Sequence, residues 1–156
     1  MQKIIDLKKQ NLSTNNSSFV LLSLGSNIEP KLDYLNKAIF YLNNDGYCKI
    51  IKLSKILKNP AILYTKQDDF LNQIIEIKTF LNPFELLDYV KELEKRIGRQ
   101  PRFRYGPREI DIDILFYEHF TVNTDKLIIP HPGVYEREYL KILLQEFELS
   151  KYHFNI

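Results

Sequence analysis

Residues 99–116 read RQPRFRYGPREIDIDILF, and this stretch combines a clear strand pattern with a high density of charge. From Ile110 onward, apolar residues alternate with Asp111 and Asp113, which is the pattern of a half-buried β-strand. Side chains on a strand alternate between its two faces, so the aspartates should point one way and the isoleucines the other. The fold must therefore bury one side of this strand and keep an acidic pair on the other.

The acidic pair suggests a cation site. Two carboxylates about 7 Å apart on one strand face repel each other unless a cation lies between them. Mg²⁺ prefers oxygen ligands and is usually held by one or two carboxylates together with substrate phosphates. A tight turn predicted at Gly106-Pro107 would hold the preceding arginines close to the strand. These arginines, which could meet the phosphates, are Arg99, Arg102, Arg104 and Arg108.

The stretch therefore predicts a magnesium–polyphosphate site. The alternative is a solvated acidic face beside a loop of surface arginines, and the pattern alone leaves both open.

Composition favours one globular domain. The chain has 156 residues, of which 44% are hydrophobic and 27% charged, and its net charge of +2 does not require a nucleic-acid partner. No apolar run approaches the length of a membrane span, and the N-terminus lacks an apolar signal region. A single cysteine, Cys48, excludes an internal disulfide and fits a reducing compartment. We expect a cytoplasmic monomer with a loosely ordered leader at 1–17 and one domain at 18–156.

Hydrophobic periodicity predicts strands at 19–24, 49–57, 70–78 and 110–116, and helices at 30–43, 83–97 and 135–147. A broken return stretch is expected at 120–129. The order β-α-β-β-α-β, with an additional strand and a C-terminal helix, is typical of an α+β ferredoxin-like fold with an antiparallel sheet and helices on one face. Loops at 58–68 and 99–107 precede the strand at 70–78 and the acidic strand, and we expect them to act as lids that exclude water.

The second helix has the clearest boundaries. Asn82 is its expected N-cap, Pro83 opens it, Glu85 completes a capping box, and Gly98 ends it. Glu94 falls on its apolar stripe, where a carboxylate needs a partner. That partner is either an arginine of the following loop or a polar ligand, and the sequence leaves both open.

Four motifs identify a family. They are Leu24-Gly25-Ser26-Asn27, Asp69-Phe70-Leu71-Asn72, the run Arg104-Tyr105-Gly106-Pro107-Arg108-Glu109-Ile110-Asp111-Ile112-Asp113-Ile114, and Ile129-Pro130-His131-Pro132. In this order and spacing the sequence resembles the 6-hydroxymethyl-7,8-dihydropterin pyrophosphokinase family of folate biosynthesis, over about residues 20–144. The resemblance implies transfer of pyrophosphate from ATP to the hydroxymethyl group of the pterin, with release of AMP.

The resemblance also implies roles for individual residues. Asp111 and Asp113 would hold two Mg²⁺ ions that bridge the ATP phosphates, and Arg99, Arg102 and Arg108 would be the catalytic arginines that clamp them. The residues around ATP would be Glu94, Ile114, Lys126, His131 and Arg137. The pterin, with its ring between two aromatic side chains, would be bound by Asn59, Pro60, Ile62, Phe70, Asn72, Tyr105 and Tyr139.

Some positions depart from the family pattern. Tyr139 stands where phenylalanine is usual, Leu63 where the pterin loop often has glycine, and Gly133 where arginine is frequent. Two alternative functions remain open on the residues alone. One is a single-stranded RNA-binding module that uses the Arg99–Arg108 loop with its aromatic side chains. The other is a pyrophosphokinase with a different acceptor.

Overall fold

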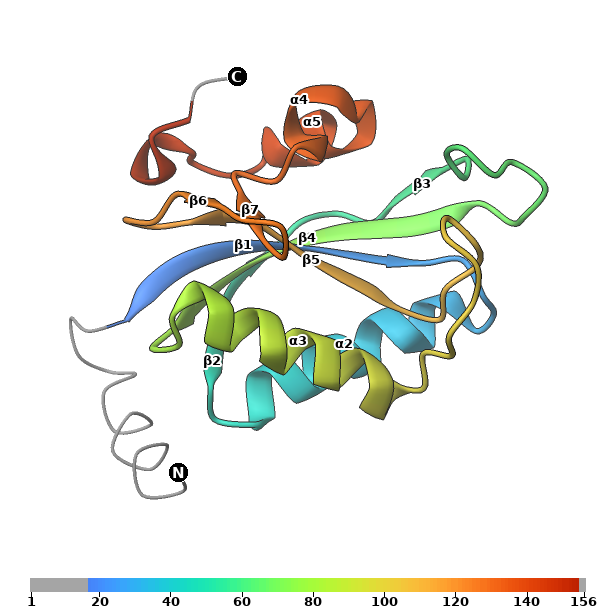
Figure 1. Ribbon diagram of the computed structural model, residues 1–156, viewed down its shortest axis with the longest axis horizontal. Coiled ribbons are helices and arrows are strands. Elements are labelled where there is room, and N and C mark those ends of the chain that lie inside the picture. Colours follow the sequence, from blue (N-terminus) through green and yellow to red (C-terminus); the bar gives the residue numbers. More distant parts are fainter. Residues whose placement is uncertain (1–16, 155–156) are drawn as a thin grey trace.

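The computed structural model describes residues 17–154, which form a five-stranded antiparallel sheet with helices on both faces (Figure 1). In chain order the elements are β1 (Ser18–Ser26), α2 (Lys31–Asn44), β2 (Cys48–Leu53), β3 (Leu57–Asn59), β4 (Phe70–Thr79), α3 (Pro83–Ile97), β5 (Asp111–Tyr117), β6 (Val122–Asn123), β7 (Ile128–Ile129), α4 (Gly133–Glu136), α5 (Glu138–Leu144) and a 3₁₀ turn at Ser150–Tyr152. The strand order β2-β4-β1-β5, with β3 paired to β4, confirms the predicted ferredoxin-like core. Of the predicted leader at 1–17, only Ser17 falls within the described residues.

The central strand is β1, which pairs with β4 on one side and β5 on the other. Its residues from Val20 to Ser26 are buried, because helices cover the sheet on both faces. This explains why the strand reads as a continuous apolar run rather than an alternating one.

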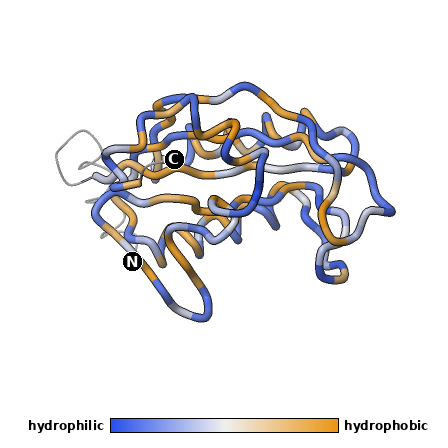
Figure 2. Tube along the Cα trace, turned by 90° about the horizontal axis from the view of Figure 1, so that it is seen from above, coloured by the Kyte–Doolittle hydropathy of each residue, from blue (hydrophilic) through white to orange (hydrophobic). Residues whose placement is uncertain are grey.

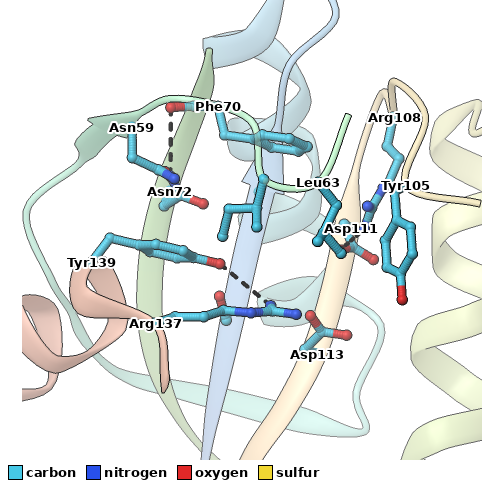
Figure 3. A pocket seen from close by; sticks show the side chains of 13 residues that line it. Asn59, Leu63, Phe70, Asn72, Tyr105, Arg108, Asp111, Asp113, Arg137 and Tyr139 are labelled. Carbon is cyan, nitrogen blue, oxygen red and sulfur yellow. Dashed lines mark hydrogen bonds and ion pairs between the residues drawn. The ribbon is translucent and has the colours of Figure 1, made fainter. Parts of the chain in front are cut away.

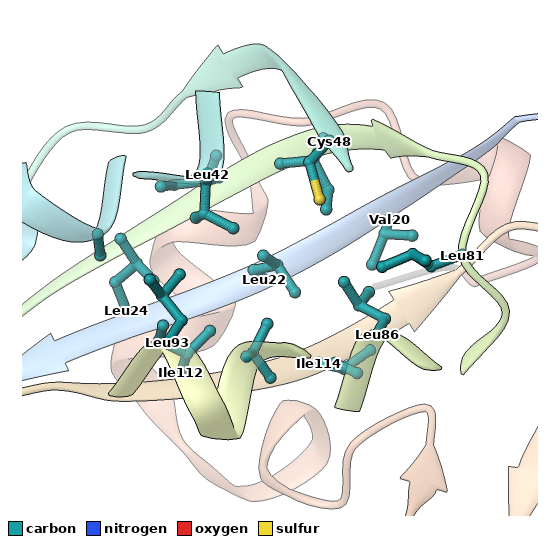
Figure 4. Close-up of a cluster of buried hydrophobic side chains, with 14 of the residues drawn as sticks. Val20, Leu22, Leu24, Leu42, Cys48, Leu81, Leu86, Leu93, Ile112 and Ile114 are labelled. Carbon is teal, nitrogen blue, oxygen red and sulfur yellow. The ribbon is translucent and has the colours of Figure 1, made fainter. Parts of the chain in front are cut away.

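One face of the sheet packs against α2 and α3, as predicted (Figure 4). Leucines of both helices, including Leu42, Leu86 and Leu93, meet Leu22 of β1 and Ile112 of β5 in a single apolar cluster. α3 begins with the predicted capping box, in which the Asn82 side chain accepts from the Glu85 backbone N–H and the Glu85 side chain accepts from that of Asn82. The predicted N-cap and apolar stripe therefore determine where α3 begins and which of its sides is buried.

The opposite face differs from the prediction. α4 and α5 cover it, so the helices do not all lie on one side of the sheet (Figure 1). The single helix expected at 135–147 is divided, because Arg137 has extended backbone angles between α4 and α5. α5 buries Leu140 and Leu144 against Leu115 and Phe116 of β5. Along this face the apolar covering ends where the aspartates of β5 begin.

Two further differences concern the strands. The strand expected at 49–57 is divided into β2 and β3 around Ser54, whose backbone N–H donates to the Ile74 carbonyl while its hydroxyl accepts from the Ile74 backbone N–H. In β5 the register against β1 shifts between Ile114 and Phe116, so the predicted alternation of faces holds only as far as Ile114. This bulge turns Phe116 toward the α5 side.

Two loops meet at one end of the sheet, the 60–69 loop between β3 and β4 and the arginine loop, residues 98–110, between α3 and β5 (Figure 1). This end carries both hydrophilic and hydrophobic segments (Figure 2). Within residues 17–154, none of the helices combines the length and apolar character needed to cross a membrane.

Candidate active site

Asp111 and Asp113 lie on the same face of β5, opposite Ile112 and Ile114, as the alternation predicts (Figure 3). Asp111 pairs in the ladder with Gly25 of β1 and Asp113 with Ser23, so small β1 residues border the acidic pair. Both aspartates line the same two adjoining cavities. The two carboxylates thus face open space and not the closed core.

The Asp111 carboxylate is held by two arginines. Its Oδ1 lies 3.1 Å from Arg99 Nη1, and its Oδ2 lies 2.6 Å from Arg108 Nη1. Burial acts to raise the pKa of Asp111, but the positive charges of Arg108 and Arg99 outweigh it and hold the pKa below its ordinary value. The arginine loop therefore folds back onto the start of β5 as predicted.

Asp113 lies in a different environment. Its carboxylate makes no hydrogen bond or ion pair with any residue between 17 and 154, although it faces Arg137 (Figure 3). Burial, and then the negative charge of Asp111, raise the pKa of Asp113 to about 7. A desolvated carboxylate that makes no direct ion pair, beside a second carboxylate, is what a cation site presents before the cation binds.

These donors fit a hard cation such as Mg²⁺. Two carboxylates and a cavity that can admit phosphate oxygens suffice for that ion, because Mg²⁺ keeps several of its own waters or substrate oxygens. No group of three or more histidine, cysteine or carboxylate ligands occurs in the part of the chain that the structure describes. The acidic pair therefore suits a metal that arrives with its substrate, and not one caged by protein alone.

Of the two partners expected for the Glu94 carboxylate, the structure shows an arginine of the following loop. Its Oε2 lies 3.0 Å from Arg99 Nη1 and accepts a 2.7 Å hydrogen bond from the Ile112 backbone, and its Oε1 lies 3.4 Å from Lys91 Nζ. Burial raises the pKa of Glu94, and the charges of Lys91 and Arg99 partly offset it. In this structure Glu94 links α3, β5 and the arginine loop, and so positions Arg99 beside Asp111.

Arg102 pairs with Glu109 and not with either aspartate of the acidic pair. Its guanidinium binds Glu109 in a two-pronged contact, with distances of 2.6 and 2.8 Å, and this hydrogen bonding lowers the pKa of Glu109. Arg102 nevertheless lines a cavity of about 370 Å³ along the inner side of the arginine loop. That cavity also borders Arg99, Arg108, Asp113 and Arg137. It lies within the size range of small-molecule sites.

Six of the seven predicted pterin residues line one cavity, and the exception is Pro60. Phe70 and Tyr139 lie on opposite sides of it, and Asn72 lies at the edge between them (Figure 3). The Asn72 amide donates to the Asn59 side chain and, at 3.2 Å, to the Leu57 carbonyl. Two aromatic walls and a polar edge are the kinds of contact that a flat, polar heterocycle needs. The six residues are Asn59, Ile62, Phe70, Asn72, Tyr105 and Tyr139.

A third cavity brings together Ile114, Lys126 and His131 of the predicted nucleotide residues. His131 Nδ1 accepts from the Gly133 backbone N–H at 2.9 Å, which leaves the ring proton on Nε2. Burial and the charge of Arg137 lower the pKa of His131, so its ring is neutral. Asp113 also lines this cavity and thus borders all three.

The sequence reasoning missed two side chains that join the loops to the sheet. Asn27, just after β1, accepts from the Arg108 backbone N–H at 2.8 Å and donates to Gln67 Oε1 at 2.7 Å. The Gln67 amide in turn donates to the carbonyls of Tyr64 and Tyr105. A polar residue that directly follows a buried strand was the available signal for Asn27, and the sequence held none for Gln67.

Comparison with known proteins identifies relatives of the whole domain. The model of the family "7,8-dihydro-6-hydroxymethylpterin-pyrophosphokinase (HPPK)" matches residues 21–149. The 2-amino-4-hydroxy-6-hydroxymethyldihydropteridine pyrophosphokinase of Bacillus subtilis is 39% identical over 132 residues, covering 85% of this chain and 78% of its own. The enzyme of the same name from Aquifex aeolicus is 40% identical over 134 residues, covering 86% and 82%.

A solved structure supports the fold. The HPPK-DHPS of Plasmodium falciparum, crystallised with pterin and p-hydroxybenzoate, superimposes with a TM-score of 0.63 at 18% identity. The match covers 84% of this chain and 38% of the Plasmodium chain, which is therefore much longer than the matched domain. At this identity the likeness shows the shared fold alone.

Proposed function

The chain belongs to the 7,8-dihydro-6-hydroxymethylpterin-pyrophosphokinase family, and from that premise we propose how its residues carry out the reaction. The activity is that of a pyrophosphokinase of folate biosynthesis, which transfers pyrophosphate from ATP to the hydroxymethyl group of 6-hydroxymethyl-7,8-dihydropterin and releases AMP.

We assign the metal-binding role to Asp111 and Asp113. The observation that carries this assignment is the free Asp113 carboxylate next to the arginine-bound Asp111, on one face of β5 and at the junction of three cavities. Two Mg²⁺ ions held there would neutralise charge on the oxygens of ATP. Arg99 and Arg108 neutralise Asp111 in this structure and are free to exchange that carboxylate for phosphate oxygens.

The arginine loop then supplies catalysis by position and charge. Phosphoryl-type transfer needs little covalent assistance from the protein, because charge spread over the transferred group is the main demand. Guanidinium groups fixed before reaction stabilise that charge without rearranging. We place Arg108 and Arg99 in this role, with Arg102 joining them if it leaves Glu109. The ion pairs that Arg99 and Arg108 both make with Asp111 support the assignment of these two arginines.

The substrates occupy different cavities. We propose that the pterin lies between Phe70 and Tyr139, and that its polar edge replaces the Asn59 side chain as the partner of Asn72. Adenine would lie in the cavity of Ile114, Lys126 and His131, where a neutral imidazole can donate from Nε2. The hydroxymethyl group and the triphosphate would then meet near Asp113, the side chain that the cavities share.

The decisive experiment measures AMP formation from ATP and Mg²⁺ with and without the pterin alcohol. We expect AMP only when both substrates and the metal are present, together with a product in which pyrophosphate is attached to the pterin. AMP formation that is independent of the pterin would indicate another acceptor. Binding of single-stranded RNA with a steep salt dependence and no need for Mg²⁺ would favour the RNA-binding alternative.

We further propose that residues 18–156 act as one domain, as a monomer in the cytoplasm. The single cysteine, which is buried and unpaired, fits a reducing compartment and supports this location. Sedimentation of the purified full chain, with and without ATP, tests the monomer.

A further inference from the structure

Leu63 lies at the apex of an unusual turn in the 60–69 loop. Its φ is +70°, and the Tyr64 backbone N–H donates to the Ile62 carbonyl at 2.8 Å, which closes a three-residue turn around it. A γ-turn with positive φ at its centre is the rare, strained form, and leucine gains nothing from that conformation. Backbone strain of this kind persists only where surrounding contacts hold it, and it is concentrated at ligand clamps and active sites.

Contacts on the C-terminal side of Leu63 hold the turn in place. The Tyr64 ring meets the Phe103 ring of the arginine loop edge to face, with centroids 5.0 Å apart. The Tyr64 carbonyl accepts from Gln67 Nε2 at 2.7 Å, and the same amide donates to the Tyr105 carbonyl at 2.8 Å. Both loops therefore contribute to fixing the position of Leu63.

The Leu63 side chain lines the cavity that contains Phe70 and Tyr139, yet it is 71% exposed (Figure 3). Tyr105, which also has positive φ and is 39% exposed, lines the same cavity from the arginine loop. An exposed apolar side chain at a cavity wall has surface that a bound ring can remove from water. Asn72 and Asn59 offer polar contacts to such a ring, but they cannot supply this apolar cover.

We infer that Leu63 is a specificity-determining residue that covers the ring of the bound dihydropterin at the mouth of its cavity. The inference rests on the proposed function, since it takes the pterin to be the occupant of that cavity. The strained turn is what aims the side chain at the cavity. The position thus contributes apolar contact to pterin binding and none to the nucleotide, whose proposed cavity does not include Leu63.

Substitutions at Leu63 can separate the contribution of its side chain from that of its backbone conformation. Leu63→Ala removes the cover and keeps the backbone restriction, Leu63→Gly removes both, and Leu63→Met restores an apolar side chain of similar length. His119→Gly is the matched control, because His119 also has positive φ, of 67°, but lies in an exposed turn after β5 and lines none of the three cavities. This variant shows how relief of backbone strain, away from the cavities, affects pterin binding.

The measurement is equilibrium binding of fluorescent 6-hydroxymethylpterin in the presence of Mg²⁺ and a non-hydrolysable ATP analogue, together with steady-state KM values for both substrates. We expect Leu63→Ala to weaken pterin binding about fivefold, as partial loss of a leucine contact does, with the KM for ATP unchanged. Leu63→Met should bind the pterin nearly as tightly as wild type does, and the pterin affinity of His119→Gly should equal that of wild type.

Two results would overturn the inference. One is wild-type pterin affinity in Leu63→Ala, and the other is an equal loss of pterin and nucleotide affinity, which indicates collapse of the loop. Failure of the proposed function is distinguishable, since wild-type protein would then neither bind the pterin nor form AMP in its presence.

Discussion

On the face of the sheet that packs against α2 and α3, β5 presents Ile112 and Ile114, whereas on the opposite face it presents Asp111 and Asp113. On the first face, both isoleucines join an apolar core that two helices close. The second is apolar only where α5 covers Leu115 and Phe116, and it carries charge where no helix covers it. One strand thus serves the core on one side and the proposed metal site on the other.

The difference shows how a small α+β domain can hold charges at a fixed position. The buried isoleucines anchor the strand, so the aspartates are positioned by packing that they do not share. Asp113 gives the fold little stability in return, because its carboxylate has neither an ion pair nor a hydrogen bond with any described residue. Activity and stability should therefore respond to different substitutions on the two faces of β5.

The strongest test of this separation changes the charged face. Asp111→Asn and Asp113→Asn keep the shape of the side chains but remove the carboxylates proposed to bind Mg²⁺. We expect each to lower the rate of AMP formation by about 10³-fold or more, since metal neutralisation of phosphate charge contributes several kcal/mol. Circular dichroism should show folding as in wild type. Mg²⁺-dependent turnover near the wild-type rate would remove the metal assignment.

A somewhat smaller effect is expected for the arginine that holds Asp111. Arg108→Ala should lower kcat by roughly 10²–10³-fold, which is typical of losing one preformed charge donor. Arg96→Ala is the control, because it also breaks an arginine–aspartate pair, with Asp45, but on α3 and away from the three cavities. If both variants lose activity equally, Arg108 acts through folding and not through the substrate.

The apolar face should respond in the opposite way. Leu86 is fully buried between α3 and the sheet, and Leu86→Ala leaves a cavity there, so we expect about 3 kcal/mol less free energy of unfolding in urea. The folded fraction should keep the wild-type kcat at low temperature. Phe84→Ala, on the exposed side of the same helix at 43% exposure, should cost much less. A loss of kcat in folded Leu86→Ala protein would show that the two faces are coupled.

The sequence predicted what depends on local pattern. The capping box at Asn82 and the period-two alternation up to Ile114 each arise from neighbouring residues, so both were readable and both are confirmed. The divided C-terminal helix could not be predicted, because the periodicity continues through Arg137 and neither glycine nor proline marks the position where its backbone becomes extended. The bulge after Ile114 likewise depends on pairing with β1.

The residues of the site likewise divide into those predictable from local sequence and those brought together only by the fold. The acidic pair and the arginine loop lie close in sequence, and their meeting was predicted from the turn at Gly106-Pro107. The alternative partners of Glu94 could be decided only in space, where Arg99 and the Ile112 backbone reach it. Gln67, which bridges two loops through backbone carbonyls, leaves no pattern in the sequence because its partners Asn27 and Tyr105 are distant along the chain.

The last expected effect is a pH dependence of stability that belongs to the charged face alone. The pKa of Asp113 is raised from its ordinary 3.8 to about 7 in the fold, first by burial and then by Asp111. The folded protein therefore binds this proton more tightly than the unfolded chain does. The resulting stability is complete below pH 3.8 and is lost as the pH rises to about 7, so Asp113→Asn should flatten this part of the metal-free unfolding curve.

A carboxylate whose pKa is lowered in the folded protein changes the stability with pH in the opposite direction, and it provides the internal control. Glu109, whose pKa is lowered chiefly by its hydrogen bonds from Arg102, adds stability above its ordinary pKa of 4.5 that is lost in acid, and this acid limb should persist in Asp113→Asn. Above pH 7, Mg²⁺ should stabilise wild type, because a cation that binds only the folded protein shifts the unfolding equilibrium. Equal stabilisation of Asp113→Asn by Mg²⁺ would place the ion elsewhere, and the charged face of β5 would then need another explanation for its unpaired carboxylate.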